Sequence, residues 1–401
     1  MYDVIVVGAR CAGASLAMLL ARKGQRVLLL DKETFPSDFI ATHMVWPPGG
    51  AALKRWGIWD EVAAADPALC RISYSTFVVG ELRGPFHAVE GVDYTFNLRR
   101  VKLDEILVRA ARRAGAEVRE AVALDDLLYD GDRVVGVVAH EVRTGRRFEE
   151  RAALVVGADG KNSTVAKRVG ARAYQVVEAL TASYLLYAED FPIDRTVDEV
   201  HTRPPYEYVI LPTDSGLTVV NLVLTRSLLT EFRADVTKSF SAAYDRAPEL
   251  GERLRASRPV TRVLGVVDLP NFYRVPYGEG WALVGDAGIT RDPVRAQGQH
   301  SAFQDAELLA TAIQDGLSGT TSLKDALAGY QQKRDDRTRA SYKMCLDAAR
   351  LEVPTPEAWA ALEVILGKDP QAAADFRGLV PASIQPREFF ARWGDRAPVA
   401  R

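Results

Sequence analysis

Residues 2–31 read YDVIVVGARCAGASLAMLLARKGQRVLLLD, and this stretch decides the fold of the N-terminal part of the chain. A short apolar run leads into a glycine-marked turn and a helix-forming segment, and a second apolar run ends at Asp31. This order predicts a strand, a helix and a second, parallel strand. Gly8 would allow the tight turn, Gly13 would let helix and strand pack closely, and Asp31 stands where a ribose hydroxyl is bound. The unpaired N–H groups at the helix N-terminus would bind a pyrophosphate, so the stretch predicts a dinucleotide cofactor.

The turn departs from the G-x-G-x-x-G pattern at its middle position, which is Arg10. A glycine there normally lets the backbone approach the diphosphate closely. The Arg10 guanidinium would compensate by pairing with a phosphate, or its side chain would point into solvent, and the sequence leaves both alternatives open. A turn of this kind is compatible with NAD, NADP or FAD.

Two later segments narrow the choice of cofactor. Residues 155–163 read VVGADGKNS, and residues 281–298 read WALVGDAGITRDPVRAQG. Together with RRVKLDEIL at 99–107, they resemble the motifs of the FAD-dependent monooxygenases of the p-hydroxybenzoate hydroxylase-like class, in the same order. Lys167 departs slightly from that class, which often has arginine there. The resemblance implies a tightly bound FAD, with NADPH or NADH as a transient reductant.

The resemblance also implies positions for the cofactor. Asp159 would lie near the pyrophosphate, and Ser163 would begin the next helix. Asp286 would bind the ribityl chain, and Pro293 would lie against the flavin ring. The helix after Gly298 would point its N-terminus at the pyrimidine end, where it would stabilise the anionic reduced flavin. The expected FAD contacts are Gly8, Arg10, Cys11, Ala12, Gly13, Asp31, Lys32, His43, Arg100, Val122, Asp159, Asp286, Pro293, Gly298, Gln299 and His300.

The resemblance implies a reaction with O2 and a small aromatic or natural-product-like substrate, through a flavin C4a-hydroperoxide that hydroxylates the substrate. A saturase similar to geranylgeranyl reductases, which inserts no oxygen, stays open as the main alternative. A flavin-dependent halogenase is less favoured, because that family carries a W-x-W-x-I-P segment and a lysine beside its tunnel, whereas the close tryptophans here lie in RWGIWD. A non-catalytic flavin-binding protein is a further alternative, and an NAD-dependent dehydrogenase would leave the two later motifs unexplained.

The sequence nominates no catalytic residue. His43 and His300 are candidates for proton transfer near the flavin, and the alternative for each is a ring that holds a loop through backbone hydrogen bonds. Tyr184, Tyr206 and Tyr208 lie on expected strands, where they would either face an aromatic ligand or belong to the core.

Composition limits the class of protein. The net charge of −2 provides no field for nucleic acid, and no apolar stretch reaches the length of a membrane helix. The three cysteines are widely spaced, which fits neither a disulfide framework nor a metal site. Met1 leads almost directly into the first strand, so we expect no secretion signal and a cytoplasmic location. The sequence predicts no oligomeric state.

Hydrophobic patterning predicts an α/β fold, in which a doubly wound, glutathione-reductase-like Rossmann domain binds FAD and holds an inserted antiparallel sheet. A helical insert at about residues 228–255 interrupts the sheet, and a helical tail ends the chain. The predicted FAD-binding segments are 1–71, 100–172 and 273–350. The predicted substrate-domain segments are 72–99 and 173–272, and the tail is 351–401.

Overall fold

The computed structural model describes residues 1–41 and 43–396. Its first large sheet contains the two predicted strands, and the predicted helix connects them. Its strands follow the order β20-β21-β11-β1-β2-β8. The five strands from β21 to β8 run parallel, as a doubly wound sheet requires. The bounds are β1 Tyr2–Val7, β2 Val27–Leu30, β8 Glu117–Arg119, β11 Arg147–Gly157, β20 Tyr277–Gly278 and β21 Trp281–Leu283.

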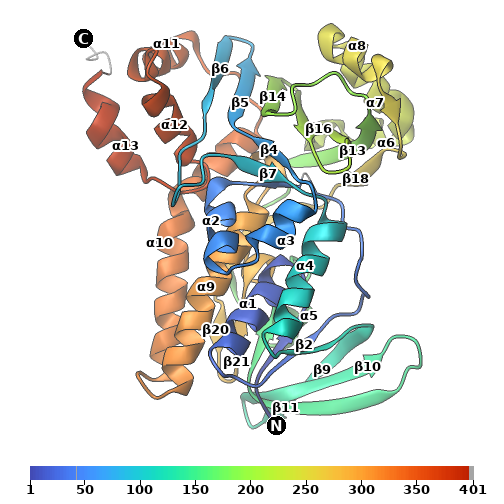
Figure 1. The fold of residues 1–401 in the computed structure, drawn as a ribbon, viewed down its shortest axis with the longest axis vertical. Coiled ribbons are helices and arrows are strands. Elements are labelled where there is room, and N and C mark those ends of the chain that lie inside the picture. The colour runs from blue at the N-terminus through green and yellow to red at the C-terminus, as the bar shows by residue number, and fades with distance from the viewer. Residues whose placement is uncertain (42, 397–401) are drawn as a thin grey trace.

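The two faces of this sheet have different covers. Val4 and Val6 pack with three helices on one face, whereas Ile5 and Val7 pack with a β-hairpin and α5 on the other. Figure 1 shows the hairpin at the lower end of the molecule, near the N-terminus. The predicted α/β fold is confirmed, and a hairpin supplies most of its second layer. The helices are α1 Cys11–Arg22, α4 Arg100–Arg113 and α9 Gly298–Leu317; the other face carries β9 Val122–Asp130, β10 Arg133–Glu141 and α5 Thr164–Arg168.

The second large sheet has the strand order β17-β13-β16-β15-β14-β5-β6, and β18 also pairs with β13. Its neighbours are antiparallel except β14 and β5, which are parallel. The predicted antiparallel sheet is therefore present with one parallel pair, where the early segment joins the later one. The bounds are β5 Ile72–Phe77, β6 Gly80–Pro85, β13 Thr181–Glu189, β14 Val197–Arg203, β15 Tyr206–Pro212, β16 Thr218–Thr225, β17 Arg258–Pro259 and β18 Leu264–Val266.

Alternate residues of the second sheet face opposite sides, and the two sides have different surroundings. Tyr184, Tyr208 and Leu222 pack beneath three helices, whereas Ser183 and Asn221 on the opposite face line a cavity. The helices lie within the predicted helical insert and appear at the upper right of Figure 1. They are α6 Leu229–Ala234, α7 Val236–Asp245 and α8 Pro248–Ala256.

The C-terminal region is helical, and proline starts its last three helices. Proline suits the first helical turn because its missing N–H has no intrahelical partner there. Thr355 and Asp369 cap two of these helices with their side chains. The last five residues of the predicted tail, 397–401, lie outside the described residues. The helices are α10 Leu323–Ala349, α11 Pro356–Leu366, α12 Pro370–Gly378 and α13 Pro386–Trp393.

Short elements connect the two large sheets. The connecting elements are α2 Pro47–Arg55, α3 Trp59–Ala64, β3 Met44–Val45, β4 Ala68–Cys70, β7 Thr95–Asn97, β12 Ala173–Val177, β19 Asn271–Arg274 and β22 Ile289–Thr290.

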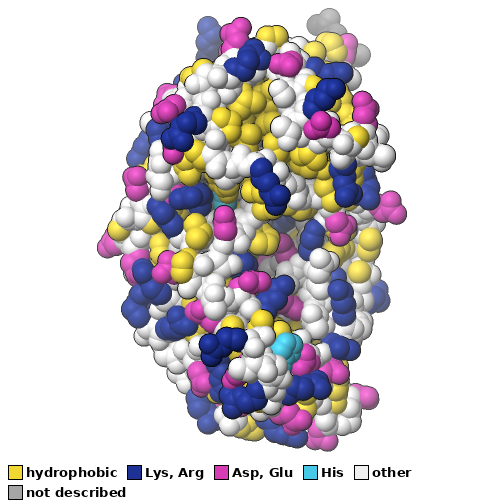
Figure 2. Space-filling model, turned by 90° about the vertical axis from the view of Figure 1, so that its right-hand side faces the viewer, with side chains coloured by type: hydrophobic (Ala, Val, Ile, Leu, Met, Phe, Trp, Pro, Cys, Tyr) yellow, Lys and Arg dark blue, Asp and Glu magenta, His cyan; other side chains and the backbone are white. Residues whose placement is uncertain are grey.

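No helix among the described residues is long and apolar enough to cross a membrane. On the face in Figure 2, basic and acidic side chains are interspersed, and apolar side chains gather in the upper part.

Candidate active site

The turn between β1 and α1 requires its glycines. Gly8 has φ +104°, and a Cβ there would lie 2.5 Å from the carbonyl oxygen of Ala158. A Cβ on Gly13 would lie 1.7 Å from the carbonyl oxygen of Gly8. The helix therefore begins directly against the strand. Its N-cap residue, Arg10, makes no side-chain cap, so first-turn N–H groups stay available for an anion.

Arg10 forms a cluster with Arg100 and Asp104 at this helix end. Arg10 Nη1 lies 2.8 Å from Asp104 Oδ2, and the Arg100 guanidinium donates two hydrogen bonds of 2.9 Å to the same carboxylate. Both guanidinium groups also lie over the ring of Phe39. Arg10 therefore neither points into solvent nor lacks a partner. Two arginines share one carboxylate, so the cluster keeps a net charge of about +1, which favours a phosphate.

Asp31 and Val122 meet at the end of β2. The Asp31 carboxylate accepts hydrogen bonds from the N–H groups of Ala9, at 2.6 Å, and Glu33, at 2.9 Å, and burial raises its pKa. The Val122 N–H donates to the Asp31 carbonyl. Lys32 follows and is exposed. The predicted ribose carboxylate is thus held rigidly beside the β1–α1 turn.

Asp159 lies next to the same turn but faces another helix. Its carboxylate accepts a hydrogen bond from the Thr164 N–H at 2.6 Å and one from Ser163 Oγ at 2.5 Å. Ser163 is the N-cap of α5, as the resemblance implied. Burial raises the pKa of Asp159. In this structure the Asp159 carboxylate holds the DG segment and the start of α5 together.

Asp286 is exposed, although surrounding protein atoms desolvate its carboxylate. It lies in the 3-10 turn η2, Gly285–Ala287. A Cβ added to Gly285 would lie only 2.7 Å from the Ala12 Cβ. The turn therefore packs on the first turn of α1. Gly285 and Ala287 are buried, whereas Asp286 is not. The desolvation raises the pKa of the Asp286 carboxyl. An accessible carboxylate among protein atoms fits a hydroxylated ligand such as a ribityl chain.

The N-terminus of α9 also lacks a side-chain cap. Gln299 Nε2 donates to the Met44 carbonyl at 3.4 Å, while Gln299 Oε1 and His300 Nδ1 are buried without a hydrogen-bond partner. Burial, with the charges of two nearby arginines, holds the pKa of His300 well below its usual range. Unpartnered polar atoms beside open N–H groups would suit a polar ligand at this end of the site.

These observations together fit FAD. The uncapped α1 terminus, Arg10 and Arg100 would hold the pyrophosphate, and Asp286 would hold the ribityl chain. The uncapped α9 terminus would face the flavin ring. The structure thus brings the residues predicted from four separate segments to one edge of the first sheet.

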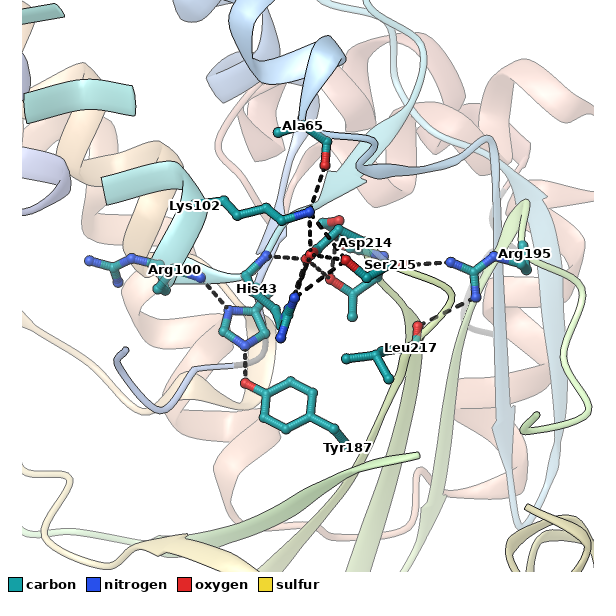
Figure 3. A network of polar contacts seen from close by, with 12 residues as sticks. His43, Ala65, Arg100, Lys102, Tyr187, Arg195, Asp214, Ser215 and Leu217 are labelled. Carbon is teal, nitrogen blue, oxygen red and sulfur yellow. Dashed lines mark hydrogen bonds and ion pairs between the residues drawn. The ribbon is translucent and has the colours of Figure 1, made fainter. Parts of the chain in front are cut away.

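His43 joins this edge to the second sheet (Figure 3). The ring is fully buried, with Nδ1 accepting from the Arg100 N–H at 3.3 Å and Nε2 bonded to the Tyr187 hydroxyl. Burial and the Arg100 charge lower the pKa of His43 to about 3, so the ring is neutral. Both ring nitrogens are occupied, which matches the predicted alternative of a histidine that holds a loop.

A neighbouring ion cluster fixes the start of α4. Asp214 accepts hydrogen bonds from the backbone N–H and the guanidinium of Arg99, and Lys102 Nζ lies 2.8 Å from its Oδ2 (Figure 3). Burial would raise the pKa of Asp214, but these donors hold it well below its usual range. The loop before β16 is thereby tied to the helix that carries Arg100.

A cavity of about 490 Å³ adjoins the motif at Pro293. The inner face of the second sheet, the 293–296 turn and the C-terminal helices form its walls. Tyr184 and Tyr208 do not reach it, because they pack against Phe232 and Tyr244 on the other face, and Tyr206 extends that cluster. The apolar lining includes Met44, Trp46, Phe77, Leu82, Val200, Val209, Val223, Pro293, Val294, Met344, Leu351, Leu362, Phe376 and Val380.

Several of these residues escaped the sequence reasoning. Asp104 had a signal, since it stands four residues after Arg100, where a helical ion pair forms. Tyr187 and Asp214 lie far from their partners in sequence, so no local pattern joins them. The contribution of the C-terminal helices to the cavity was not foreseen either.

The fold and the site define an FAD-dependent oxidoreductase, and comparison with known proteins agrees. Residues 1–344 match the family described as FAD binding domain, and the chain belongs to that family. The predictions of a p-hydroxybenzoate hydroxylase-like flavoenzyme and of FAD as its cofactor are confirmed. A nicotinamide reductant is typical of the class.

The relatives differ in the reactions that their names describe. Tryptophan 2-halogenase of Chondromyces crocatus is 27% identical over 352 residues, which cover 82% of this chain and 64% of that protein. Digeranylgeranylglycerophospholipid reductase of Methanosarcina mazei is 27% identical, with 86% and 83% covered. Kynurenine 3-monooxygenase of Stenotrophomonas maltophilia is 25% identical, with 85% and 77% covered. The myxobacterial chondrochloren halogenase shares the fold at a TM-score of 0.80, with 23% identity over 97% and 98% of the chains.

Proposed function

We propose that this protein is an NAD(P)H- and O2-dependent monooxygenase that hydroxylates a small aromatic or natural-product-like molecule. The observation that carries the proposal is the largely apolar cavity beside Pro293, whose volume suits a ligand of that size. Bound FAD would supply the hydride acceptor and the activation of oxygen. The chain itself would supply a dry, shaped chamber beside the cofactor.

The residues around Pro293 support this role by holding the cavity wall. Asp292 is buried and accepts hydrogen bonds from Thr181 Oγ1 at 2.6 Å and from the Val294 N–H at 3.1 Å. Burial raises the pKa of Asp292 to about 6. These bonds fix the turn between the second sheet and α9. The uncapped N-terminus of α9 would stabilise negative charge at the adjoining edge of the cofactor.

A reductase that inserts no oxygen is the second candidate. The apolar lining contributed by Met344, Leu362 and Phe376 would also accept a prenyl chain, and a prenyl-lipid reductase is among the relatives. Halogenation has less support, although halogenases are also relatives. No lysine lines the cavity in the described part of the chain, whereas the expected halogenase signature includes a lysine beside its tunnel.

The test uses the purified, FAD-loaded protein. NADPH or NADH is added without oxygen, flavin bleaching is followed by absorbance, and 18O2 is then admitted with phenolic, quinonoid or prenyl compounds. A monooxygenase gives substrate-dependent oxygen uptake and a product heavier by one 18O atom. Flavin reoxidation by a prenyl compound without oxygen uptake would support the reductase instead. A parallel reaction with chloride or bromide tests halogenation, and a halogenated product would refute the proposal.

A further inference from the structure

Arg377 is a buried cation in the wall of the cavity. It lies in the last turn of α12 and is 7% exposed. Its Nη1 donates to the Ala373 carbonyl at 3.0 Å, and its Nη2 donates to the Ser73 carbonyl at 3.5 Å. A guanidinium has five N–H donors, so three stay free of these two contacts. A Cβ on Gly84 would lie 3.1 Å from Nη1, so the glycine leaves room for the guanidinium.

No carboxylate balances this cation within the described residues. The other buried arginines there, Arg100 and Arg334, each pair with a carboxylate at 2.9 or 2.8 Å. Asp375 stands close in sequence, but its carboxylate is bonded to His87 and to three other side chains. Burial lowers the pKa of Arg377 to about 10, and no neighbouring acid opposes that shift. Burying an unpaired charge is costly unless a ligand compensates it.

Other polar atoms of the cavity wall point to the same kind of ligand. Trp359 Nε1 and Asn221 Nδ2 are buried, line the cavity and have no hydrogen-bond partner. Both atoms are donors. The side-chain oxygen of Asn221 is already used, because Oδ1 accepts from Ser183 Oγ at 2.7 Å. The cavity therefore presents unsatisfied donors, which suit a ligand rich in acceptors.

The acidic residues of the lining do not cancel this preference. Asp198 is buried and accepts hydrogen bonds from Thr95 and Asn97, so its carboxylate is already satisfied. Asp347 and Glu352 are exposed, and Asp347 pairs with a lysine on its own helix. The buried part of the wall is thus basic at Arg377.

We propose that Arg377 binds the carboxylate of an apolar, acidic ligand that occupies this cavity. The planar guanidinium matches a carboxylate with two parallel hydrogen bonds, while the apolar walls enclose the rest of the molecule. That this ligand is the molecule that is oxidised rests on the proposed function. The anion subsite itself does not, because binding requires neither reductant nor oxygen.

The test compares naphthalene-2-carboxylate with naphthalene-2-carboxamide, which have the same shape but differ in charge. Isothermal titration calorimetry on the FAD-loaded protein measures both without NADPH or oxygen. The unmodified protein is expected to bind the carboxylate at least about tenfold more tightly than the amide, as for a charge-assisted hydrogen bond. Equal affinities in the unmodified protein would overturn the proposal, whatever the variants do.

The variants separate binding from folding. Arg377→Met should weaken carboxylate binding about 10- to 150-fold and change amide binding little. Arg377→Lys should keep part of the preference, because it keeps the charge without the planar fork. Arg387→Met, which removes an exposed arginine from the neighbouring α13, is the matched control and should bind both probes normally.

Two other results would count against the subsite. An equal loss of both probes in Arg377→Met would mean that the side chain only shapes the wall. Loss of FAD from that variant, measured by absorbance, would assign Arg377 to the cofactor. A carboxylate preference without any oxygenated product would refute the proposed function and leave the subsite standing. Equal oxygenation of the acid and the amide would refute the subsite and leave the proposed function standing.

Discussion

Arg10→Met tests how the chain replaces the missing glycine of its nucleotide-binding turn. In the absence of ligand the change leaves the two-pronged Arg100–Asp104 pair intact, and Arg10 itself is partly exposed. We therefore expect the free energy of unfolding to fall by no more than about 1 kcal/mol. Binding of FAD should suffer more, because the cluster loses its net positive charge. One charge-assisted phosphate contact is worth about 1.5–3 kcal/mol, which corresponds to a roughly 10- to 150-fold weaker affinity.

The assay titrates FAD into apoprotein and follows flavin fluorescence, with urea unfolding measured on the same samples. Arg26→Met is the control, since Arg26 is exposed and pairs with Asp3 away from the turn. Asp104→Asn should act in the opposite direction. It leaves one buried and one half-buried arginine unpaired, so the free energy of unfolding of the apoprotein should fall by about 3–5 kcal/mol. FAD should bind more tightly, because the cluster gains positive charge. An unchanged FAD affinity in Arg10→Met, together with a large loss of stability, would show that Arg10 is purely structural.

Three further results are expected. Asp286→Ala should purify largely colourless, as the ratio of flavin to protein absorbance reports, and full FAD retention would remove the ribityl assignment. The pKa of Asp214 is lowered, so its carboxylate stabilises the fold at pH values above the usual carboxyl pKa, and this contribution is lost as the pH falls. The free energy of unfolding of Asp214→Asn, measured with urea, should therefore be lower than that of the unmodified protein at pH 7. It should also fall less than that of the unmodified protein between pH 5 and pH 3. The His43 ring, with a pKa of about 3, should show no NMR titration above pH 5, whereas titration near pH 6.5 would refute its neutral, buried state.

Local sequence predicted the glycine turn, the position of Asp31 beside it and the cap of α5, because short-range geometry determines these features. Gly8, Gly13 and Asp31 lie within one strand-turn-helix-strand unit, and steric contact or a nearby backbone N–H fixes each of them. Ser163 likewise caps the helix that follows it directly. Such features depend on neighbours within a few residues, or on one sheet edge where parallel strands end.

The cavity half was not predictable to the same depth, for a physical reason. Strands β13 and β16 are buried on both faces, so apolar residues lie on both faces and the sequences show no clear alternation. Nothing in ALTASYLLYAED tells that Tyr184 faces α6–α8 while Tyr187 faces His43. A register shift by one residue would exchange these faces, and only the tertiary packing decides between them.

The same division separates the residues that would hold FAD from those that line the cavity. Contacts from the β1–α1 turn, η2 and α9 would hold FAD, whereas the cavity wall comes from β5, β13–β16 and three C-terminal helices. Arg377 belongs to the second group and makes no described contact with the first. Substitutions in the two groups should therefore have additive effects on binding free energy, since separated sites without shared partners rarely couple. An Arg10→Met, Arg377→Met double variant should show each single loss undiminished, in FAD affinity and in carboxylate affinity respectively; strong coupling between them would mean that the cation in the cavity wall serves the cofactor.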